Sequence, residues 1–458
     1  MRLHEAVGGR RARIRKSRCR TPVMHVRTSA SSEDLDSAVA GDGLRAVFQP
    51  IVSLTDGGVI GYEALARWAH LVDVPCEDVF THAVLTDRAS HLERRCIEAA
   101  VTGAQEAGLT PGSTLFINCE ATAHHLSRSD SPILARGADQ FRVVFEVTER
   151  SLLANPRDLL RKVVALREEG FAIALDDVGT DMNALALLDV LAPDVIKLDL
   201  SLVQSRSHYQ QARTWSAVLS HHELAGTRVL AEGIETAEHL QRALALGATL
   251  GQGFRFGRPG PLPRDVATST PWPPIRTQHP CVDFGSPFDT LAAHVGHVST
   301  GLTIRRHSWD TVMALSRYVE RQALDARDPP MVLAALQRAE FFTGETRTEL
   351  EHLGEHSPMV AVFGCDVAEH LGRGIRGVRL GRDDALHRQW IVVALGANTA
   401  AALVCQEVAD HHDGTGGRLF DVVSSNDRTV VTAVARQLLS RMLLPTVSPH
   451  PPSASPHI

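Results

Sequence analysis

The chain has 458 residues, of which 44% are hydrophobic and 22% charged, and its net charge is −6. These values are typical of globular proteins, and the length allows two or more domains, each with its own core. The charge gives no reason to expect a nucleic-acid polymer as partner, and no apolar run approaches the roughly 20 residues that span a bilayer. Seven cysteines without a CxxC pair favour reduced thiols, and hence a cytoplasmic protein, over a disulfide framework.

Changes in composition divide the chain. The first residues are strongly basic but lack the apolar core of a signal peptide, so we expect a disordered arm, with docking of an anionic partner as the alternative. The stretch "GRPGPLPRDVATSTPWPPIRTQHP" is too rich in proline for regular structure and predicts a linker. The predicted parts are a basic arm and lead-in at 1–40, a first domain at 41–262, a linker at 263–285, a second domain at 286–446 and a disordered tail at 447–458.

The first domain alternates short β-branched runs with amphipathic segments. The runs are "VIGYEAL", "TLFIN", "RVVFEVTE", "AIALDD", "DVIKLD" and "RVLAEGIE", and between them lie helix-like stretches such as "HLERRCIEAAVTGAQEAG" and "PRDLLRKVVALREEG". Such alternation predicts a parallel sheet covered by helices. We therefore expect an α/β fold, namely a (β/α)8 TIM-like barrel followed by a second, smaller α/β domain; a doubly wound open sheet is the alternative for the first domain.

Almost every predicted strand of this domain ends in a polar or acidic residue. In a parallel barrel the carboxyl ends of the strands share one face, so these side chains should converge there. Six strand ends in phase are a much stronger signal than one. The residues are Glu63, Asn118, Glu146, Asp176 with Asp177, Lys197 with Asp199, and Glu232.

Packed carboxylates repel one another unless protons or cations neutralise them. Carboxylate and amide oxygens without cysteine or histidine select hard divalent ions such as Mg²⁺ or Mn²⁺, and paired ions activate water toward a phosphodiester. Lys197 could orient that water, or it could merely pair with Asp199. Arg67 offers a planar fork for phosphate, with an ordinary surface ion pair as the alternative. The residues thus predict a metal-dependent phosphodiesterase.

The motifs "FQPIVSL", "GYEALARW", "FIN", "FEVTE", "LDDVGT", "VIKLD", "AEGIET" and "GQGFRFGRP" occur in this order over about half of the chain. The region resembles the EAL family of cyclic-di-GMP phosphodiesterases, which is named after a tripeptide present here at residues 63–65. The resemblance implies hydrolysis of cyclic di-(3′,5′)-GMP to linear pGpG with two Mg²⁺ or Mn²⁺ ions. It also suggests a homodimer formed through the barrel.

Site residues follow from the resemblance, position by position. It implies metal ligands at Glu63, Asn118, Glu146, Asp176, Asp177 and Glu232, with Lys197 contacting the catalytic water beside Asp177 and Glu232. It implies substrate contacts at Gln49, Leu65, Arg67 and Gln252, and support for the loop after Asp177 at Glu149 and Glu235.

Two segments depart from the family pattern. Where members have DFGTG followed by small serines, this chain has "DVGTDMNAL", in which Asp181 replaces a glycine. The segment "NCEATA" replaces the usual Asn-Leu-Ser-Pro type, although Asn118 is retained. These departures motivate an alternative function, a catalytically weak or inactive receptor that binds cyclic-di-GMP and signals through protein contacts. A scaffold with neither property would leave the carboxylates unexplained.

The second domain has no comparable cluster. We expect strands at "SPMVAVFG", "QWIVVALG" and "LFDVVSSND", and helices at "TAAALVCQEVAD" and "RTVVTAVARQLLSRML". "GANTAAAL" lacks the lysine and glycine spacing of a phosphate loop, so it predicts a plain strand-to-helix turn. Parts of this region resemble the DICT sensory domain, which implies regulation of the barrel by an unidentified ligand or protein. Trp309, Phe341, Phe342 and Trp390 are expected to pack in its core.

Overall fold

The protein is described here by a computed structural model. The basic segment, the C-terminal tail, Glu149 and most of the predicted linker lie outside the described part. The described residues are 30–71, 74–121, 123–148, 156–180, 185, 188–205, 209–263, 285–296, 301–342, 344–412 and 417–442.

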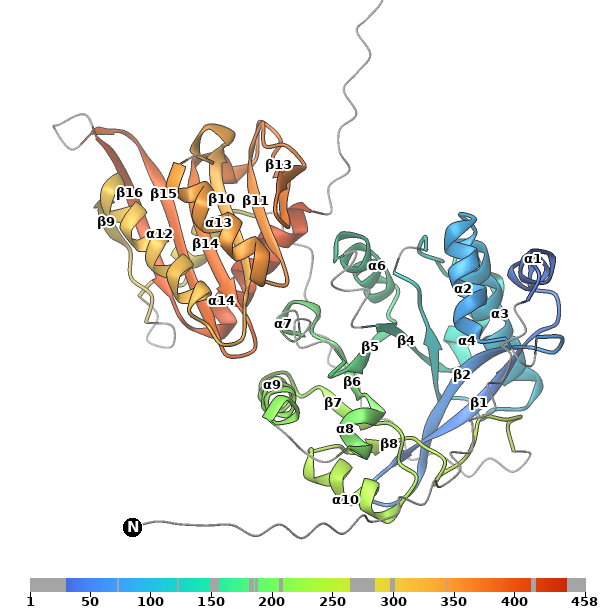
Figure 1. The fold of residues 1–458 in the computed structure, drawn as a ribbon. Helices are drawn as coiled ribbons and strands as arrows, with labels where there is room; N and C mark the ends of the chain where they lie inside the picture. The colour runs from blue at the N-terminus through green and yellow to red at the C-terminus, as the bar shows by residue number, and fades with distance from the viewer. Residues whose placement is uncertain are drawn as a thin grey trace, which may run out of the picture.

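The N-terminal half is a closed eight-stranded barrel, as predicted (Figure 1). Strands β2 to β8 are parallel to their neighbours, but β1 pairs antiparallel with both β2 and β8. The expectation of a wholly parallel sheet was therefore wrong for β1. The connection between β1 and β2 is too short for a helical crossover, so the two strands form a hairpin. The strands are β1 Leu44–Ser53, β2 Val59–Trp68, β3 Thr114–Asn118, β4 Arg142–Thr148, β5 Ala172–Val178, β6 Val195–Leu198, β7 Arg228–Ala231 and β8 Leu250–Gly251.

Two apolar layers stabilise the barrel. Ile51, Phe116, Val144 and Leu230 belong to the cluster inside it, while the opposite faces of the strands pack against helices. Both faces are buried, so the strands are almost continuously apolar until they reach their polar ends. The helices are α1 Ser32–Ala40, α2 Cys76–Leu85, α3 Ala89–Glu106, α4 Pro132–Gln140, α6 Pro156–Glu168, α7 Leu188–Leu191, α8 Leu200–Gln204, α9 Tyr209–Ala225 and α10 Ala237–Ala245.

Segments at both ends of the predicted barrel also pack on it. Helix α1 begins at a capping box formed by Ser31 and Asp34, and it buries Ala38 and Val39 completely. At the other end, Gly260 pairs with Phe48 of β1. The ordered structure around the barrel therefore starts before residue 41, within the segment that we expected to be a lead-in.

The C-terminal half forms an open eight-stranded sheet in the order β12-β13-β11-β10-β14-β15-β16-β9. Helices α12 and α13 cover one face and α14 the other, so the second domain is α/β as predicted (Figure 1). The elements are α11 Pro287–Ala292, β9 Arg305–Ser308, α12 Trp309–Leu324, β10 Met331–Arg338, η2 Ala339–Phe341, α13 Gly344–His356, β11 Val360–Cys365, β12 His370–Gly372, β13 Ile375–Arg379, η3 Ala385–Arg388, β14 Gln389–Leu395, β15 Ala400–His412, β16 Arg418–Ser425 and α14 Arg428–Arg441.

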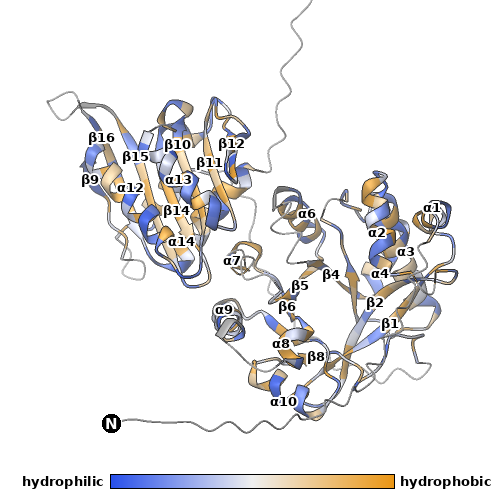
Figure 2. Ribbon diagram, in the orientation of Figure 1, coloured by the Kyte–Doolittle hydropathy of each residue, from blue (hydrophilic) through white to orange (hydrophobic). Residues whose placement is uncertain are grey.

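One secondary-structure prediction in this domain is wrong. The segment "TAAALVCQEVAD" is not a helix but the central strand β15, and "GANTAAAL" spans a strand-to-strand hairpin. Ala402 and Val404 pack toward α14, whereas Leu403 and Cys405 pack toward α12. Because both faces are buried, the strand lacks the alternation that would have revealed it (Figure 2). Pairing with two neighbours overrides the helix propensity of the alanines.

The two domains share a continuous apolar core. Residues of α7 and α14 belong to the same cluster of buried side chains, which extends from the barrel helices to the second sheet. Trp309, Phe341 and Trp390 pack together in the other core of the second domain, as expected. Among the helices of the described residues, none has the length and hydropathy needed to cross a membrane.

Candidate functional site

Five strand ends bring charged side chains together at one end of the barrel. Lys197 of β6 is completely buried and lies among carboxylates from four other strands. Its Nζ is 2.8 Å from Glu146 Oε1 on β4, 3.0 Å from Asp176 Oδ1 on β5, 2.9 Å from Glu232 Oε1 after β7 and 3.7 Å from Glu63 Oε1 on β2. The structure thus brings five of the predicted site residues into one cluster.

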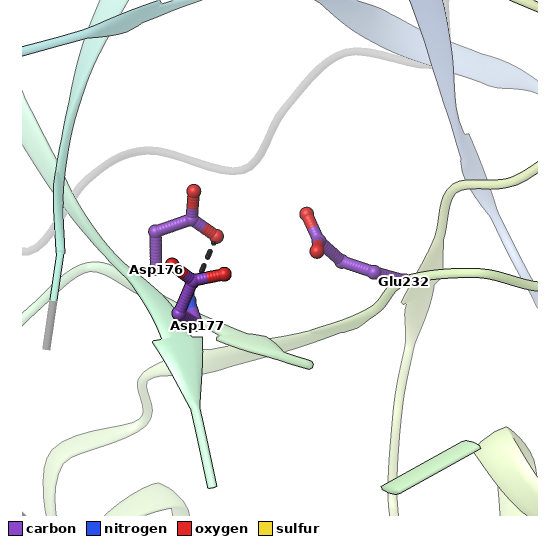
Figure 3. A group of neighbouring side chains, drawn as sticks. All are labelled: Asp176, Asp177 and Glu232. Carbon is purple, nitrogen blue, oxygen red and sulfur yellow. Dashed lines mark hydrogen bonds between the residues drawn. The ribbon is translucent and has the colours of Figure 1, made fainter. Parts of the chain in front are cut away.

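Asp177 joins this cluster through an unusual backbone conformation. Successive side chains of a strand normally point to opposite faces, so Asp176 and Asp177 should diverge. However, Asp177 has φ of 59°, in the left-handed region that non-glycine residues rarely adopt, and the register of β5 with β6 shifts at this point. Oxygens of Asp176, Asp177 and Glu232 consequently lie within 4.8 Å of one another (Figure 3).

Polar side chains hold Glu63 in place. Gln252 Nε2 donates to Glu63 Oε2 at 2.5 Å and to Gln49 Oε1 at 3.1 Å, and Gln49 Nε2 donates to Gly257 O at 3.1 Å. Asn118 Nδ2, from the end of β3, lies 3.3 Å from Glu63 Oε1. Gln49, Asn118 and Gln252 therefore lie beside the cluster rather than elsewhere on the barrel.

The charges of the cluster do not balance. Burial, followed by repulsion from Glu63, raises the pKa of Glu146 well above its ordinary value. Burial raises the pKa of Glu232 to about 8, against the attraction of Lys197. For Lys197 burial favours the neutral amine, but the surrounding carboxylates hold its pKa well above the ordinary value. One ammonium group thus lies among four carboxylates, with Asp177 close by, and some of these groups must be protonated unless other cations are bound.

The same residues fit divalent cations. Although Glu146 is almost completely buried, neither of its carboxylate oxygens accepts a well-oriented hydrogen bond within the described part of the chain. Its ion pair with Lys197 is shared with three other carboxylates, so the negative charge of Glu146 is not balanced by the lysine alone. Oxygen donors from Glu63, Asn118, Glu146, Asp176, Asp177 and Glu232 are those that Mg²⁺ and Mn²⁺ prefer.

Other predicted residues have different surroundings. Leu65 and Arg67 lie on the same face of β2 as Glu63, but Arg67 Nη1 donates to Ala66 O at 2.8 Å and approaches Cys76 Sγ at 3.7 Å. No carboxylate of the described residues lies within ion-pair distance of Arg67. Glu235 is exposed beyond the end of β7, and Glu149 lies outside the described residues. Their roles therefore stay predictions.

Asp199 and Cys119 have structural roles. Asp199 caps α8 by accepting a hydrogen bond from Ser201 N at 2.9 Å, so it is not the partner of Lys197. Cys119, next to Asn118, is buried and packs in the apolar core. It lies against a second ion pair that we did not predict, in which Lys162 Nζ contacts both carboxylate oxygens of Glu93 at 2.6 and 2.8 Å.

This second pair holds the segment after Asn118. Lys162 of α6 also donates to Glu120 O and Ala123 O, and Glu120 N donates to Glu93 Oε2 at 3.0 Å. In the sequence, the pair was indicated only by the position of Glu93 and of Lys162, each on the otherwise apolar face of its helix. That signal is weak, because long charged side chains often cover apolar surface with the head group in water.

Two family profiles match the chain. The profile described as EAL domain matches residues 32–259, and the profile described as sensory domain in diguanylate cyclases and two-component systems (DICT) matches residues 289–408. The barrel and the second sheet domain thus each correspond to one profile.

Individual relatives match about half of the chain. The chain is 32% identical over 241 residues to an uncharacterized protein of Azorhizobium caulinodans, covering 49% of this chain and 32% of the relative. It is 29% identical over 236 residues to the cyclic di-GMP phosphodiesterase RocR of Pseudomonas aeruginosa, covering 47% of this chain and 57% of RocR. The chain therefore corresponds to about a third to just over half of these relatives.

Solved structures of similar sequence also cover about half of the chain. A c-di-GMP complex of the phosphodiesterase PaMucR is 25% identical and covers 50% of this chain and 96% of its own, with a TM-score of 0.44. A manganese and cy-diGMP complex of BlrP1 from Klebsiella pneumoniae is 29% identical and covers 48% of this chain and 57% of its own, with a TM-score of 0.43.

Proposed function

Because the chain belongs to the EAL family through residues 32–259, we propose that its barrel is an active phosphodiesterase that hydrolyses cyclic di-(3′,5′)-GMP to linear pGpG. The observation that carries this proposal is the convergence of four carboxylates on the buried Lys197 at the carboxyl ends of the strands. A barrel that needed these groups only for stability would balance their charges, because unpaired buried carboxylates are costly.

We propose that Glu63, Asn118, Glu146 and Asp176 hold one divalent cation and that Asp176 and Asp177, with Glu232 alongside, hold a second. When bound, the cations supply Lewis-acid activation of water and neutralise charge on the phosphate. The net reaction forms one bond from a water oxygen to phosphorus and breaks one bond from phosphorus to a ribose 3′ oxygen, which takes up a proton. The product has a 5′ phosphate and a free 3′ hydroxyl group.

The residues of the chain contribute in three ways. Lys197 stays protonated among the carboxylates, so its Nζ can orient the attacking water and stabilise the phosphorane-like transition state. Gln252 fixes the direction of Glu63 by the hydrogen bond to Oε2. Gln49, Leu65 and Arg67 are proposed to hold the substrate near the mouth, where the guanidinium of Arg67 suits a phosphate.

The test is a turnover assay with product identification. The purified full chain with Mn²⁺ and cyclic-di-GMP should yield linear pGpG, separated by chromatography. Glu63→Ala should lower the rate by about a thousandfold or more, because a bound cation contributes several kcal/mol of charge stabilisation. Glu238→Ala, which removes an exposed glutamate of α10, is the matched control and should leave the rate unchanged.

Two outcomes would contradict the proposal. Product formation by Glu63→Ala at the wild-type rate would remove the ligand assignment. Tight binding of cyclic-di-GMP without turnover, with both Mg²⁺ and Mn²⁺, would instead favour a receptor, the alternative that the departures in "DVGTDMNAL" motivate.

A further inference from the structure

In its described part, the crossover between β5 and β6 has less helix than the crossovers on either side of it. These strands carry Asp176 and Lys197, and the described residues between them include only α7, a single helical turn. The neighbouring crossovers are covered by longer helices, α6 before β5 and α9 before β7. The side chains of Leu188, Val190 and Leu191 are nevertheless buried, because α14 of the second domain packs against α7 (Figure 1).

A buried aspartate on α7 is bound by both domains. Asp189 is 8% exposed, and its Oδ1 lies 2.9 Å from Nδ1 of His221 on α9. Its other oxygen accepts from Nε of Arg428 on α14 at 2.7 Å. Burial would raise the pKa of Asp189, but the hydrogen bond from His221 and the charge of Arg428 hold it below its ordinary value. The carboxylate is therefore stabilised jointly by a histidine of the barrel and an arginine of the second domain.

Two more arginines bind the carbonyl end of α7. Arg436 of α14 donates to Asp189 O and to Val190 O, and Arg167 of α6 donates to Ala192 O at 2.6 Å. These carbonyls have no partner within so short a helix and attract cations. Ala192 itself has φ of 46°, a conformation that costs free energy for a residue other than glycine and that needs surrounding contacts to persist.

The turn between β14 and β15, which the sequence marked by "GANT", connects Arg428 to the second sheet. Arg428 Nη1 donates to Ala397 O at 3.1 Å and Nη2 to Gly396 O at 2.7 Å. Asn398 Nδ2 donates to Asp328 at 2.8 Å, and Asp328 pairs with Arg213 of α9. The turn between β14 and β15 thus contacts two of the polar bridges to the barrel, the one made by Arg428 and the one made by Asp328.

A direct path leads from α7 to the proposed catalytic residues. Asp194, two residues beyond Ala192, accepts from Ile173 N at 2.9 Å, and its own N donates to Ile173 O at 2.8 Å. Asp194 comes directly before β6 and stands three residues before Lys197, just as Ile173 of β5 stands three residues before Asp176. A shift of α7 would therefore act, through these two hydrogen bonds, on the strands that carry Asp176 and Lys197.

We propose that the second domain is the outer cover of the β5–β6 crossover and that Arg428, acting on Asp189, is a positioning residue for the metal-binding strand ends. A change in the turn between β14 and β15 then alters the barrel site through α7. This inference rests on the proposed function, since it assigns the residues that position the same site.

The test compares Arg428→Ala in the full chain with Arg306→Ala as a matched control. Arg306 forms a bidentate pair with Asp421 at 2.9 and 3.0 Å, but this pair is exposed and joins two strands of the second sheet, β9 and β16. Arg428→Ala should weaken Mn²⁺ binding about tenfold, as measured by calorimetry. Removing a group that orients a metal ligand typically weakens metal binding by about 10- to 100-fold, and we expect the lower value. In the metal-free protein, the same variant should also speed amide hydrogen exchange in α7 and in the two strands β5 and β6.

Arg306→Ala should change neither readout. The proposal is overturned if Arg428→Ala speeds exchange only in α14 and the turn while Mn²⁺ affinity stays at the wild-type value. Should Arg428→Ala fail to fold, Asp189→Asn tests the same bridge with a side chain of equal size. We expect Asp189→Asn to lose less than tenfold in Mn²⁺ affinity. If this variant has wild-type affinity and wild-type hydrogen exchange in β5 and β6, the proposal is contradicted.

The two proposals can fail separately. If the wild-type protein binds Mn²⁺ but forms no pGpG, the phosphodiesterase proposal fails, whereas the affinity and exchange measurements still decide on Arg428. If pGpG is formed equally well by wild type and Arg428→Ala, with equal Mn²⁺ affinity and exchange, the positioning role fails and the phosphodiesterase proposal stands.

Discussion

The barrel contains two buried lysines whose surroundings differ in one respect. The side chains of Lys162 and Lys197 are 3% and 1% exposed, and both lie within 3 Å of carboxylate oxygens. Lys162 faces one carboxylate, Glu93, and donates its remaining protons to backbone carbonyls. Lys197 faces four carboxylates from four strands. The first cluster is electrically balanced, whereas the second has an excess of negative charge.

This difference separates a structural ion pair from a candidate active site. Burial and short distances alone do not distinguish them, since both lysines have these properties. What distinguishes them is the charge that is left over, because an excess of buried carboxylates requires protons or cations that the chain does not supply. The following changes test whether the two clusters differ in function as they differ in charge.

The largest effect is expected from Lys197→Met, which removes the ammonium but keeps most of the side-chain volume. We expect the rate of pGpG formation to fall by about 10²- to 10⁴-fold, as for the loss of a group that positions a proton or the attacking water. Mn²⁺ binding should persist, because removing a positive charge from among carboxylates does not weaken their attraction for a cation. Calorimetry with Mn²⁺ alongside the assay separates the two effects, and a variant as active as wild type would contradict the assigned role.

Lys162→Met should act on stability. The substitution leaves Glu93 buried without its cation, which costs about 3–5 kcal/mol of the free energy of unfolding. Replacing both residues, Glu93→Leu with Lys162→Met, should restore most of this loss because no charge is left uncompensated. Urea unfolding measures both variants. An equally large loss in the double variant would mean that the pair acts through its hydrogen bonds to the segment after Asn118 rather than through charge.

The strand ends of the barrel were predictable for a physical reason. A parallel barrel needs apolar residues on both faces of each strand, so Glu63, Glu146 and Asp176 stood out against their neighbours in the sequence. The left-handed conformation of Asp177 was not predictable, because its neighbours contain only the ordinary signals of a strand end. The Glu93–Lys162 pair was not predictable either. Charged residues are common on helices, and sequence spacing does not show which residues of two different helices are in contact.

The second domain shows a different limit. Strand β15 contains alanines on both faces, and its helix propensity is overridden by pairing with β14 and β16, which no local pattern reveals. Contact between α14 and α7 also joins residues far apart in the chain, such as Asp189 and Arg428. Sequence patterns therefore predicted two α/β domains but not that one of them covers the crossover of the other.

Glu320 extends the comparison to a buried carboxyl group that has no salt bridge among the described residues. It is 2% exposed, accepts a hydrogen bond from Ser316 at 3.0 Å, and forms no salt bridge with the described residues. Burial raises its pKa to about 7. The folded protein thus binds this proton more tightly than the unfolded chain does, so the contribution to stability is complete below about pH 4.5 and is lost as the pH rises through 7.

Glu320→Gln should remove that dependence. Relative to the variant, the wild-type protein should lose about 2.5 kcal/mol of unfolding free energy between pH 5 and 8, which is most of the effect of the shift in pKa. Urea unfolding of both proteins across this range, with the difference plotted against pH, cancels the titration of other groups. A difference that does not change with pH would show that Glu320 is ionised at all these values, and that a buried carboxylate can persist here without a cation.

The smallest effect is expected from Gln252→Ala at the cluster around Lys197. Gln252 binds no proposed cation but donates to Glu63 Oε2 and so fixes one ligand. Its loss should weaken Mn²⁺ binding by about tenfold, or about 1.4 kcal/mol, because Glu63 must then be ordered when the cation binds. Gln105→Ala is the control, since Gln105 makes a similar side-chain bond to Gln140 at 2.9 Å on the exposed surface of α3. Equal affinity in both variants would mean that repulsion among the carboxylates, and not Gln252, determines the position of Glu63.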